Sequence, residues 1–201
     1  MKKLSIICSL ILFIIAGTVT SATVYAVEPI TVAGGEEAGS QLPLEPIGEQ
    51  QMSSVQKVEY SLPFPGILPD HPLYFLKRLR DTILEKLISD PIRKTEFYIL
   101  QADKRLAMGN LLMEAGKGTL GESTISKAEK YMEQAISGMA LHKKNGGSVP
   151  GYVIERLEKA TAKHQEVITE LLNKAQETEK AGLQGSMKLL QEITASIASL
   201  K

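Results

Sequence analysis

Apolar residues recur at alternating spacings of three and four through the second half of the chain, and this period restricts the fold more than any other feature. Residues at these spacings share one face of an α-helix. The three clearest stripes are Ile92, Thr95, Ile99, Ala102, Leu106, Gly109 and Met113; Ile125, Ala128, Met132, Ala135, Met139 and His142; and Val153, Leu157, Ala160, His164, Val167 and Leu171. Each stripe predicts a helix that buries this face against its neighbours.

Proline, glycine and capping residues divide the stripes into separate helices. Asp90-Pro91 predicts a helix start, because Asp can cap free N–H groups and Pro fits the first turn. Gly116-Lys117-Gly118 and Asn145-Gly146-Gly147 predict helix ends. Thr119 and Glu122 predict a capping box for the third helix, and Pro150 opens the fourth.

Two further stripes extend the pattern. A helix over about residues 73–88 carries Leu76, Leu79, Ile83 and Leu87, and one over about 183–200 carries Leu183, Met187, Leu190, Ile193 and Ile197. The break before the last helix, at Gly182 and Gly185, is weak, so its separation from the fourth helix stays open. Heptad-like stripes joined by short loops predict an all-α fold, an antiparallel bundle of about five helices with coiled-coil-like packing.

The first 26 residues have the pattern of a secretory signal peptide. Lys2 and Lys3 precede an apolar core over residues 4–16, and Val24-Tyr25-Ala26 predicts cleavage after Ala26. The alternative is an uncleaved anchor, because residues 4–27 carry no charge and about 20 apolar residues can span a bilayer. We therefore expect a secreted or extracytoplasmic protein of the cell envelope, with an N-terminal membrane anchor as the alternative.

Two segments without helical character follow. Residues 27–57 are rich in Gly, Pro and Glu, which is typical of a disordered acidic spacer. Residues 60–72 read YSLPFPGILPDHP, and their four prolines exclude a regular helix or a central strand. Their apolar side chains predict an extended strap packed across the helical domain, which we expect to occupy residues 58–201.

The charge balance and the rare residue types exclude several classes of function. Lys and Arg total 23, as do Asp and Glu, so the chain has no basic excess for nucleic acid. Trp is absent and aromatic residues make up 5%, which disfavours a carbohydrate-stacking surface. The single cysteine, Cys8, lies in the apolar N-terminal segment and excludes an internal disulfide and a Cys-based zinc site.

Catalytic and phosphate-binding motifs are missing. The sequence has no G-x-S-x-G turn for a nucleophile. Gly116-Lys117-Gly118-Thr119 lacks the spacing and the preceding strand of a P-loop, so we interpret it as a helix end. The carboxylate pairs Glu129/Glu133 and Glu166/Glu170 lie on helix faces that also carry lysines, and this mixture of charges suggests solvated faces. We therefore expect no enzyme activity and no cofactor.

His142 and His164 lie on inward stripes, which raises the question of a metal site. Neither follows a glutamate by three residues, as a di-iron bundle requires. Their register in an antiparallel hairpin separates them by about 15 Å and places His164 near Met132. We expect each to need only a hydrogen-bond partner, and we expect His71, His142 and His164 to bind no metal together.

The strings LPFPGILPDHPLYFLKRLRD, SDPIRKTEF, QADKRLAMG and TISKAEKYMEQAI resemble an uncharacterised bacterial family, known only as a domain of unknown function in exported or membrane-attached proteins. The similarity covers about residues 60–172. Its most specific part is a Pro-x-x-Pro-Leu-Tyr-x-Leu-Lys box formed by Pro69, Pro72, Leu73, Tyr74, Leu76 and Lys77. His71 stands where relatives commonly have Ser, so we expect Asp70 to cap the first helix. The resemblance implies a helical extracytoplasmic domain and no catalytic residue.

Together these patterns favour an exported, non-enzymatic helical module that binds an envelope protein or acts as a spacer. The alternative is an extracytoplasmic bundle that binds or senses a metal or a small ligand in a gap lined by Met and His. The sequence leaves the oligomeric state open.

Overall fold

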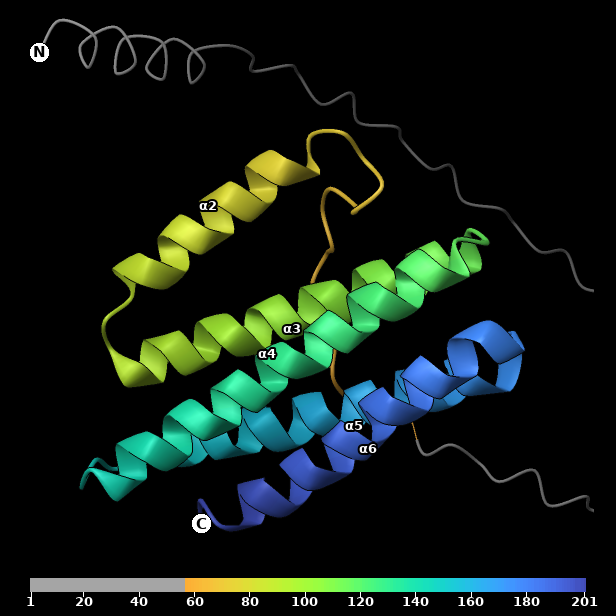
Figure 1. Cartoon of the computed structure of the whole chain (residues 1–201). Helices are drawn as coiled ribbons and strands as arrows, with labels where there is room; N and C mark the ends of the chain where they lie inside the picture. The colour runs from red at the N-terminus through yellow and green to blue at the C-terminus, as the bar shows by residue number, and fades with distance from the viewer. Residues whose placement is uncertain (1–56) are drawn as a thin grey trace, which may run out of the picture. The chain divides into compact units, whose positions relative to one another are not determined.

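The computed structural model describes residues 57–201, and the predicted signal peptide, the cleavage site after Ala26 and the spacer up to residue 56 lie outside the described residues. Residues 57–201 contain helices and no strand. The helices are α2 (Tyr74–Leu87), α3 (Pro91–Glu114), α4 (Gly118–Lys144), α5 (Gly151–Lys174) and α6 (Glu177–Ala198), shown in Figure 1. The predicted all-α fold is confirmed.

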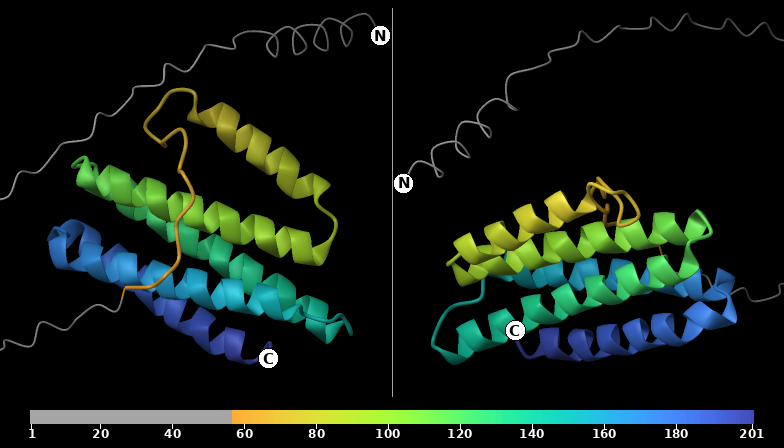
Figure 2. Two further views of the ribbon diagram at one scale, coloured as in Figure 1. Left: turned by 180° about the vertical axis from the view of Figure 1, so that it is seen from behind. Right: turned by 45° about the horizontal axis from the view of Figure 1, so that its top comes forward.

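Helices α3 to α6 form a four-helix bundle in which α3 and α6 each pack against both α4 and α5 (Figure 2). Helices that follow one another in sequence are antiparallel, as predicted. The α4–α5 loop crosses a diagonal of the bundle, however, so the neighbours α4 and α6 run parallel. Their carboxyl ends therefore meet, and Lys143 Nζ near the end of α4 donates to the carbonyls of Ser199 and Leu200 at 3.0 Å.

The core is built from the predicted stripes of α3 to α6. Ile99, Leu106, Met132, Leu157 and Leu190 are among its fully buried side chains. Ala102, Ala128, Ala135 and Ala160 are also fully buried, and these small residues let the helices pack closely. The inward direction predicted for these four stripes is confirmed.

Several predicted helix ends are confirmed by the backbone. Asp90 Oδ1 accepts a hydrogen bond of 2.7 Å from the N–H of Arg93 and caps α3. Gly116 (φ +75°) and Gly146 (φ +84°) end α3 and α4 in the left-handed conformation that favours glycine.

The predicted start of the third helix is wrong in detail. Helix α4 begins at Gly118, so Thr119 lies inside it and no side chain caps it. The reason is the tightness of the α3–α4 turn, where the carbonyl of Lys117 already accepts from the N–H of Gly121 at 2.8 Å.

The predicted start of the last helix is also wrong. Helix α6 begins at Glu177 after an extended break at Ala175 and Gln176, six residues before the predicted start at Leu183. Gly182 lies within α6, and a Cβ at this position would overlap the carboxylate of Glu122 from α4. This glycine therefore makes room for a neighbouring side chain and does not end a helix.

The strap crosses α5 and α3 before it reaches α2 (Figure 2). Tyr60 and Leu62 pack against the core, as predicted. Phe64 is 84% exposed and Ile67 is 41% exposed, so the prediction that they pack against the domain is wrong. After Leu62 the chain turns away from the bundle through a segment that includes Gly66 at φ +74°. Phe64 and Ile67 belong to this segment and therefore do not pack on the bundle.

Candidate functional site

A buried histidine joins three helices at the centre of the bundle. His164 of α5 has no exposed surface. Its Nδ1 lies 2.9 Å from Oε1 of Glu129 on α4, and its Nε2 lies 3.2 Å from Oδ1 of Asp103 on α3. A carboxylate oxygen faces each ring nitrogen, and only an imidazolium, which carries a proton on both nitrogens, can donate to both carboxylates.

The two carboxylates set the charge of this ring. Burial alone would lower the pKa of His164, but Glu129 and Asp103 raise it from 6.5 to about 9. An opposite charge on each side therefore outweighs the loss of solvent. We call Asp103, Glu129 and His164 the ionic triad.

The strap closes the triad from the side of α3. The Tyr60 hydroxyl donates to Oδ2 of Asp103 at 2.7 Å, and burial together with this bond raises the pKa of Tyr60 to about 12. Nearby on α5, Glu166 accepts from the N–H of Val58 and from Lys163 Nζ, both at 2.6 Å. The strap is thus bound to α3 and to α5 at adjacent points.

The triad corrects the prediction for the carboxylate pairs. Glu129 and Glu166 are buried, whereas Glu133 and Glu170 are exposed as predicted. The pattern within one helix could not reveal this, because Glu129 pairs with His164, 35 positions away on another helix.

The structure places the three histidines at separate sites. The prediction that His164 has a hydrogen-bond partner is confirmed, although Glu129 faces it nearly one turn away from the expected Met132. His142 follows Glu129 by 13 residues on α4, which is about 20 Å along the helix. His71 precedes α2, where its Nδ1 accepts from the N–H of Leu73 at 3.1 Å.

The donor set of the triad does not fit one metal ion, because its carboxylates bond to opposite nitrogens of the same ring. Within residues 57–201, no group of three His, Cys, Asp or Glu side chains is arranged to hold a metal. That the histidines bind no metal together stays a prediction.

Helix α2 turns polar side chains toward the bundle. The side chains of Lys77 and Asp81 are only 8% and 6% exposed and form an ion pair of 3.4 Å. Glu85, one turn further on, accepts from the Tyr98 hydroxyl of α3 at 3.0 Å. An open cavity of about 220 Å³ lies between α2 and the side chains of Arg105 and Tyr131, so this contact is loosely packed.

The opposite side of α2 is apolar and faces solvent. We call it the α2 apolar face, and it consists of Phe75, Leu76, Leu79, Ile83 and Leu87, each at least 50% exposed. The prediction that the stripe from Leu76 to Leu87 lies in the core is therefore wrong. The physical reason is that the polar stripe of the same helix finds partners, Tyr98 among them, on the bundle side.

The residues of the predicted family box surround the start of α2. Leu73 is the N-cap, Tyr74 is the first helical residue, and Lys77 Nζ lies 5.7 Å from the centre of the Tyr74 ring. Pro69 and Pro72 lie in the preceding turn, and Leu76 belongs to the α2 apolar face. The expectation that Asp70 caps α2 is wrong, because its carboxylate pairs with Lys117 in the α3–α4 loop.

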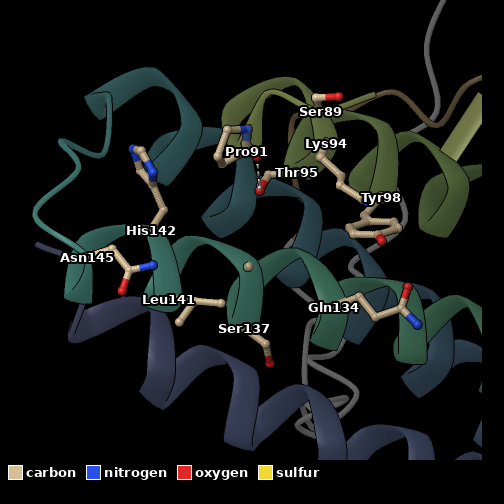
Figure 3. A pocket seen from close by; sticks show the side chains of 11 residues that line it. Ser89, Pro91, Lys94, Thr95, Tyr98, Gln134, Ser137, Leu141, His142 and Asn145 are labelled. Atoms are coloured by element: carbon tan, nitrogen blue, oxygen red, sulfur yellow. Dashed lines mark hydrogen bonds between the residues drawn. The ribbon is translucent and has the colours of Figure 1, made fainter. Parts of the chain in front are cut away.

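A pocket of about 400 Å³ lies between the first half of α3 and the last half of α4, and we call it the α3–α4 pocket (Figure 3). The sequence patterns gave no indication of it beyond the inward position of His142. Its lining residues are Ser89, Pro91, Lys94, Thr95, Tyr98, Gln134, Ser137, Gly138, Leu141, His142 and Asn145.

Fold and sites define a helical bundle protein that carries an amphipathic helix on its outside. Residues 66–178, more than half of the chain, match the family described as a domain of unknown function, DUF5667. The chain belongs to this family, which confirms the resemblance noted from the sequence. No curated protein and no solved structure matches the chain. Among residues 57–201, every helix is too short or too polar to cross a membrane.

Proposed function

We propose that this protein is an exported, non-enzymatic helical module that binds a partner protein in the cell envelope through the α2 apolar face. The observation that carries this proposal is the orientation of α2. Burying a Leu, Ile or Phe side chain is worth about 1.5–3 kcal/mol, and α2 leaves five such residues largely in solvent. A contiguous apolar surface of this kind is typical of an interaction site.

The charges around this face favour an acidic partner. Arg78 and Lys86 are exposed on α2, whereas Arg80 pairs with Asp81 at 2.7 Å and Glu85 accepts from the Tyr98 hydroxyl of α3. A second copy of α2 would bring like charges together, which disfavours self-association. The best complement is an amphipathic helix with acidic residues beside its apolar stripe, bound face to face with α2.

Export rests on the N-terminal pattern and has its own test. Protein isolated from the native host should begin at Val27 and read Val-Glu-Pro. An intact Met1 in the membrane fraction would establish the anchor instead.

The partner can be trapped with a photo-crosslinking amino acid at Leu79 in the native envelope. We expect one protein to be captured, and we expect it to bind again after purification. Ile83→Glu should weaken that binding by at least about tenfold, since it places a charge in the apolar contact. Leu111→Glu is the matched control, because Leu111 is exposed on α3, outside the α2 apolar face.

Three results would contradict the proposal. The purified partner could bind the Ile83→Glu variant as well as the wild type. The crosslinks could join two copies of this chain. The protein could bind anionic lipid vesicles through Leu79 and Ile83 with no protein partner, which would make α2 a membrane-surface helix.

A further inference from the structure

We propose that the α3–α4 pocket binds a small, mostly apolar molecule that carries one carboxylate. This site is separate from the α2 apolar face, since no residue of α2 lines it. The inference therefore goes beyond the proposed protein-binding function and can fail independently of it.

The shape and lining of the pocket suit a small organic ligand. Its volume of about 400 Å³ lies within the range of about 300–1,000 Å³ that is usual for ligand sites. Pro91 and Tyr98 of α3 face Leu141 of α4 across it, with His142 near one end and Tyr98 near the other (Figure 3). An apolar body would lie along these side chains, and polar groups at the rim would orient it.

The charged residues of the pocket favour an anion. Lys94 and His142 line it, and no Asp or Glu does. Glu85 accepts from the hydroxyl of the lining residue Tyr98, and Asp90, between the lining residues Ser89 and Pro91, caps α3. A ligand carboxylate at the Lys94 end would gain a charge-assisted hydrogen bond.

Gly138 forms part of the pocket wall without being required by helix packing. Glycine inside a helix costs about 1 kcal/mol relative to alanine. A Cβ at Gly138 would meet only Thr95 Oγ1, at an ordinary 3.8 Å, whereas one at Gly121 would lie 2.9 Å from the backbone oxygen of Gly109. The effect of glycine at position 138 is to deepen the pocket, and this observation points to a ligand independently of the charges.

A second glycine positions His142 at the rim. A Cβ on Gly147, in the α4–α5 loop, would overlap the imidazole ring of His142. The ring therefore rests against this loop, and its place beside the pocket depends on the glycine.

The test uses protein expressed from the full-length sequence and two matched probes, 2-naphthoate and 2-naphthylmethanol, titrated by calorimetry. We expect saturable one-to-one binding of naphthoate and about tenfold weaker binding of the alcohol, which lacks the charge. Gly138→Leu should abolish naphthoate binding by filling the pocket. Lys94→Gln should weaken it by about fivefold or more, through loss of the ammonium group.

Gly185→Leu is the control for the glycine substitution. Gly185 is exposed in the middle of α6, and a Cβ there would meet nothing within 4 Å. This variant should bind naphthoate like the wild type, and so should Ile83→Glu on α2. Thermal melting of Gly138→Leu at or above the wild-type temperature would show that it is folded.

The inference is overturned if the wild type does not bind naphthoate at millimolar concentration. It is also overturned if folded Gly138→Leu binds as the wild type does. Equal affinity for the alcohol and the carboxylate, or an unchanged affinity in Lys94→Gln, would refute the anionic ligand class.

Discussion

The Nδ1 atom of His164 lies 2.9 Å from Oε1 of Glu129 and links α5 to α4 across a diagonal of the bundle. The same ring reaches Asp103 of α3. One imidazolium therefore joins three of the four helices of the bundle. Replacing a buried ionic group with apolar residues is often neutral, but removing one partner leaves the other charges unpaired and costs about 3–5 kcal/mol. The triad thus ties these helices to one register.

The stability of the protein should fall as the pH rises above neutrality. Folding raises the pKa of His164 from 6.5 to about 9. The stabilisation is therefore complete below pH 6.5, decreases between pH 6.5 and 9, and is absent above that range. The difference corresponds to about 3 kcal/mol, to be measured by urea denaturation across this range.

His164→Gln provides the control for this pH dependence. The neutral amide leaves both buried carboxylates without a positive partner. Because breaking a buried ion pair is costly, the variant should be several kcal/mol less stable than the wild type at pH 6. Its free energy of unfolding should also change little between pH 6.5 and 9. A variant that kept the wild-type slope would show that another group titrates there.

Helices α3 and α4 approach each other closely at the glycines Gly109 and Gly121. A Cβ on Gly121 would lie 2.9 Å from the oxygen of Gly109 and 3.0 Å from the nitrogen of Met113, and backbone atoms cannot move aside easily. We expect Gly121→Ala to lower the free energy of unfolding by about 1–3 kcal/mol through overpacking. Gly185→Ala, in open space on α6, should raise it by about 0.5–1 kcal/mol. The same Gly→Ala change should therefore lower the free energy of unfolding at position 121 and raise it at position 185, as chemical denaturation of both variants can measure.

The α2 apolar face predicts that a leucine can be removed from this domain at almost no cost. Leu79 is 56% exposed, so Leu79→Ala should change the stability by less than about 0.5 kcal/mol. Leu106 is fully buried, and the same substitution there should cost about 2–5 kcal/mol. A loss of several kcal/mol at Leu79 would mean that α2 packs its apolar side against the bundle in solution.

The pattern of apolar residues predicted α3, α4 and α5 well, because each has one apolar stripe and no competing one. Helix α2 has two stripes, since Lys77, Asp81 and Glu85 follow the same helical period as the apolar residues. The period defines both faces but does not determine which one the tertiary structure buries. That choice depends on partners such as Tyr98, which lie on another helix.

The ionic triad could be predicted only in part. The inward position of His164 and its approximate height placed this residue near Met132, and its partner Glu129 lies within one turn of Met132. Asp103 and Tyr60 could not be inferred, because their contact depends on how the strap crosses α3. The α3–α4 pocket depends on the relative placement of two helices, which no local pattern encodes.

Tyr60 joins the strap to the ionic triad through a single hydrogen bond. Tyr60→Phe keeps the ring that packs on the core but removes the hydroxyl that donates to Asp103 at 2.7 Å. Asp103 then keeps its contact with His164 through Oδ1 but loses the donor to Oδ2. The loss of a hydrogen bond to a charged group should lower the free energy of unfolding by about 1.5–3 kcal/mol. Tyr152→Phe is the matched control, because Tyr152 is 55% exposed and should tolerate the change within about 0.5 kcal/mol. Equal free energies of unfolding for the two variants, measured in urea, would mean that the strap does not hold the triad.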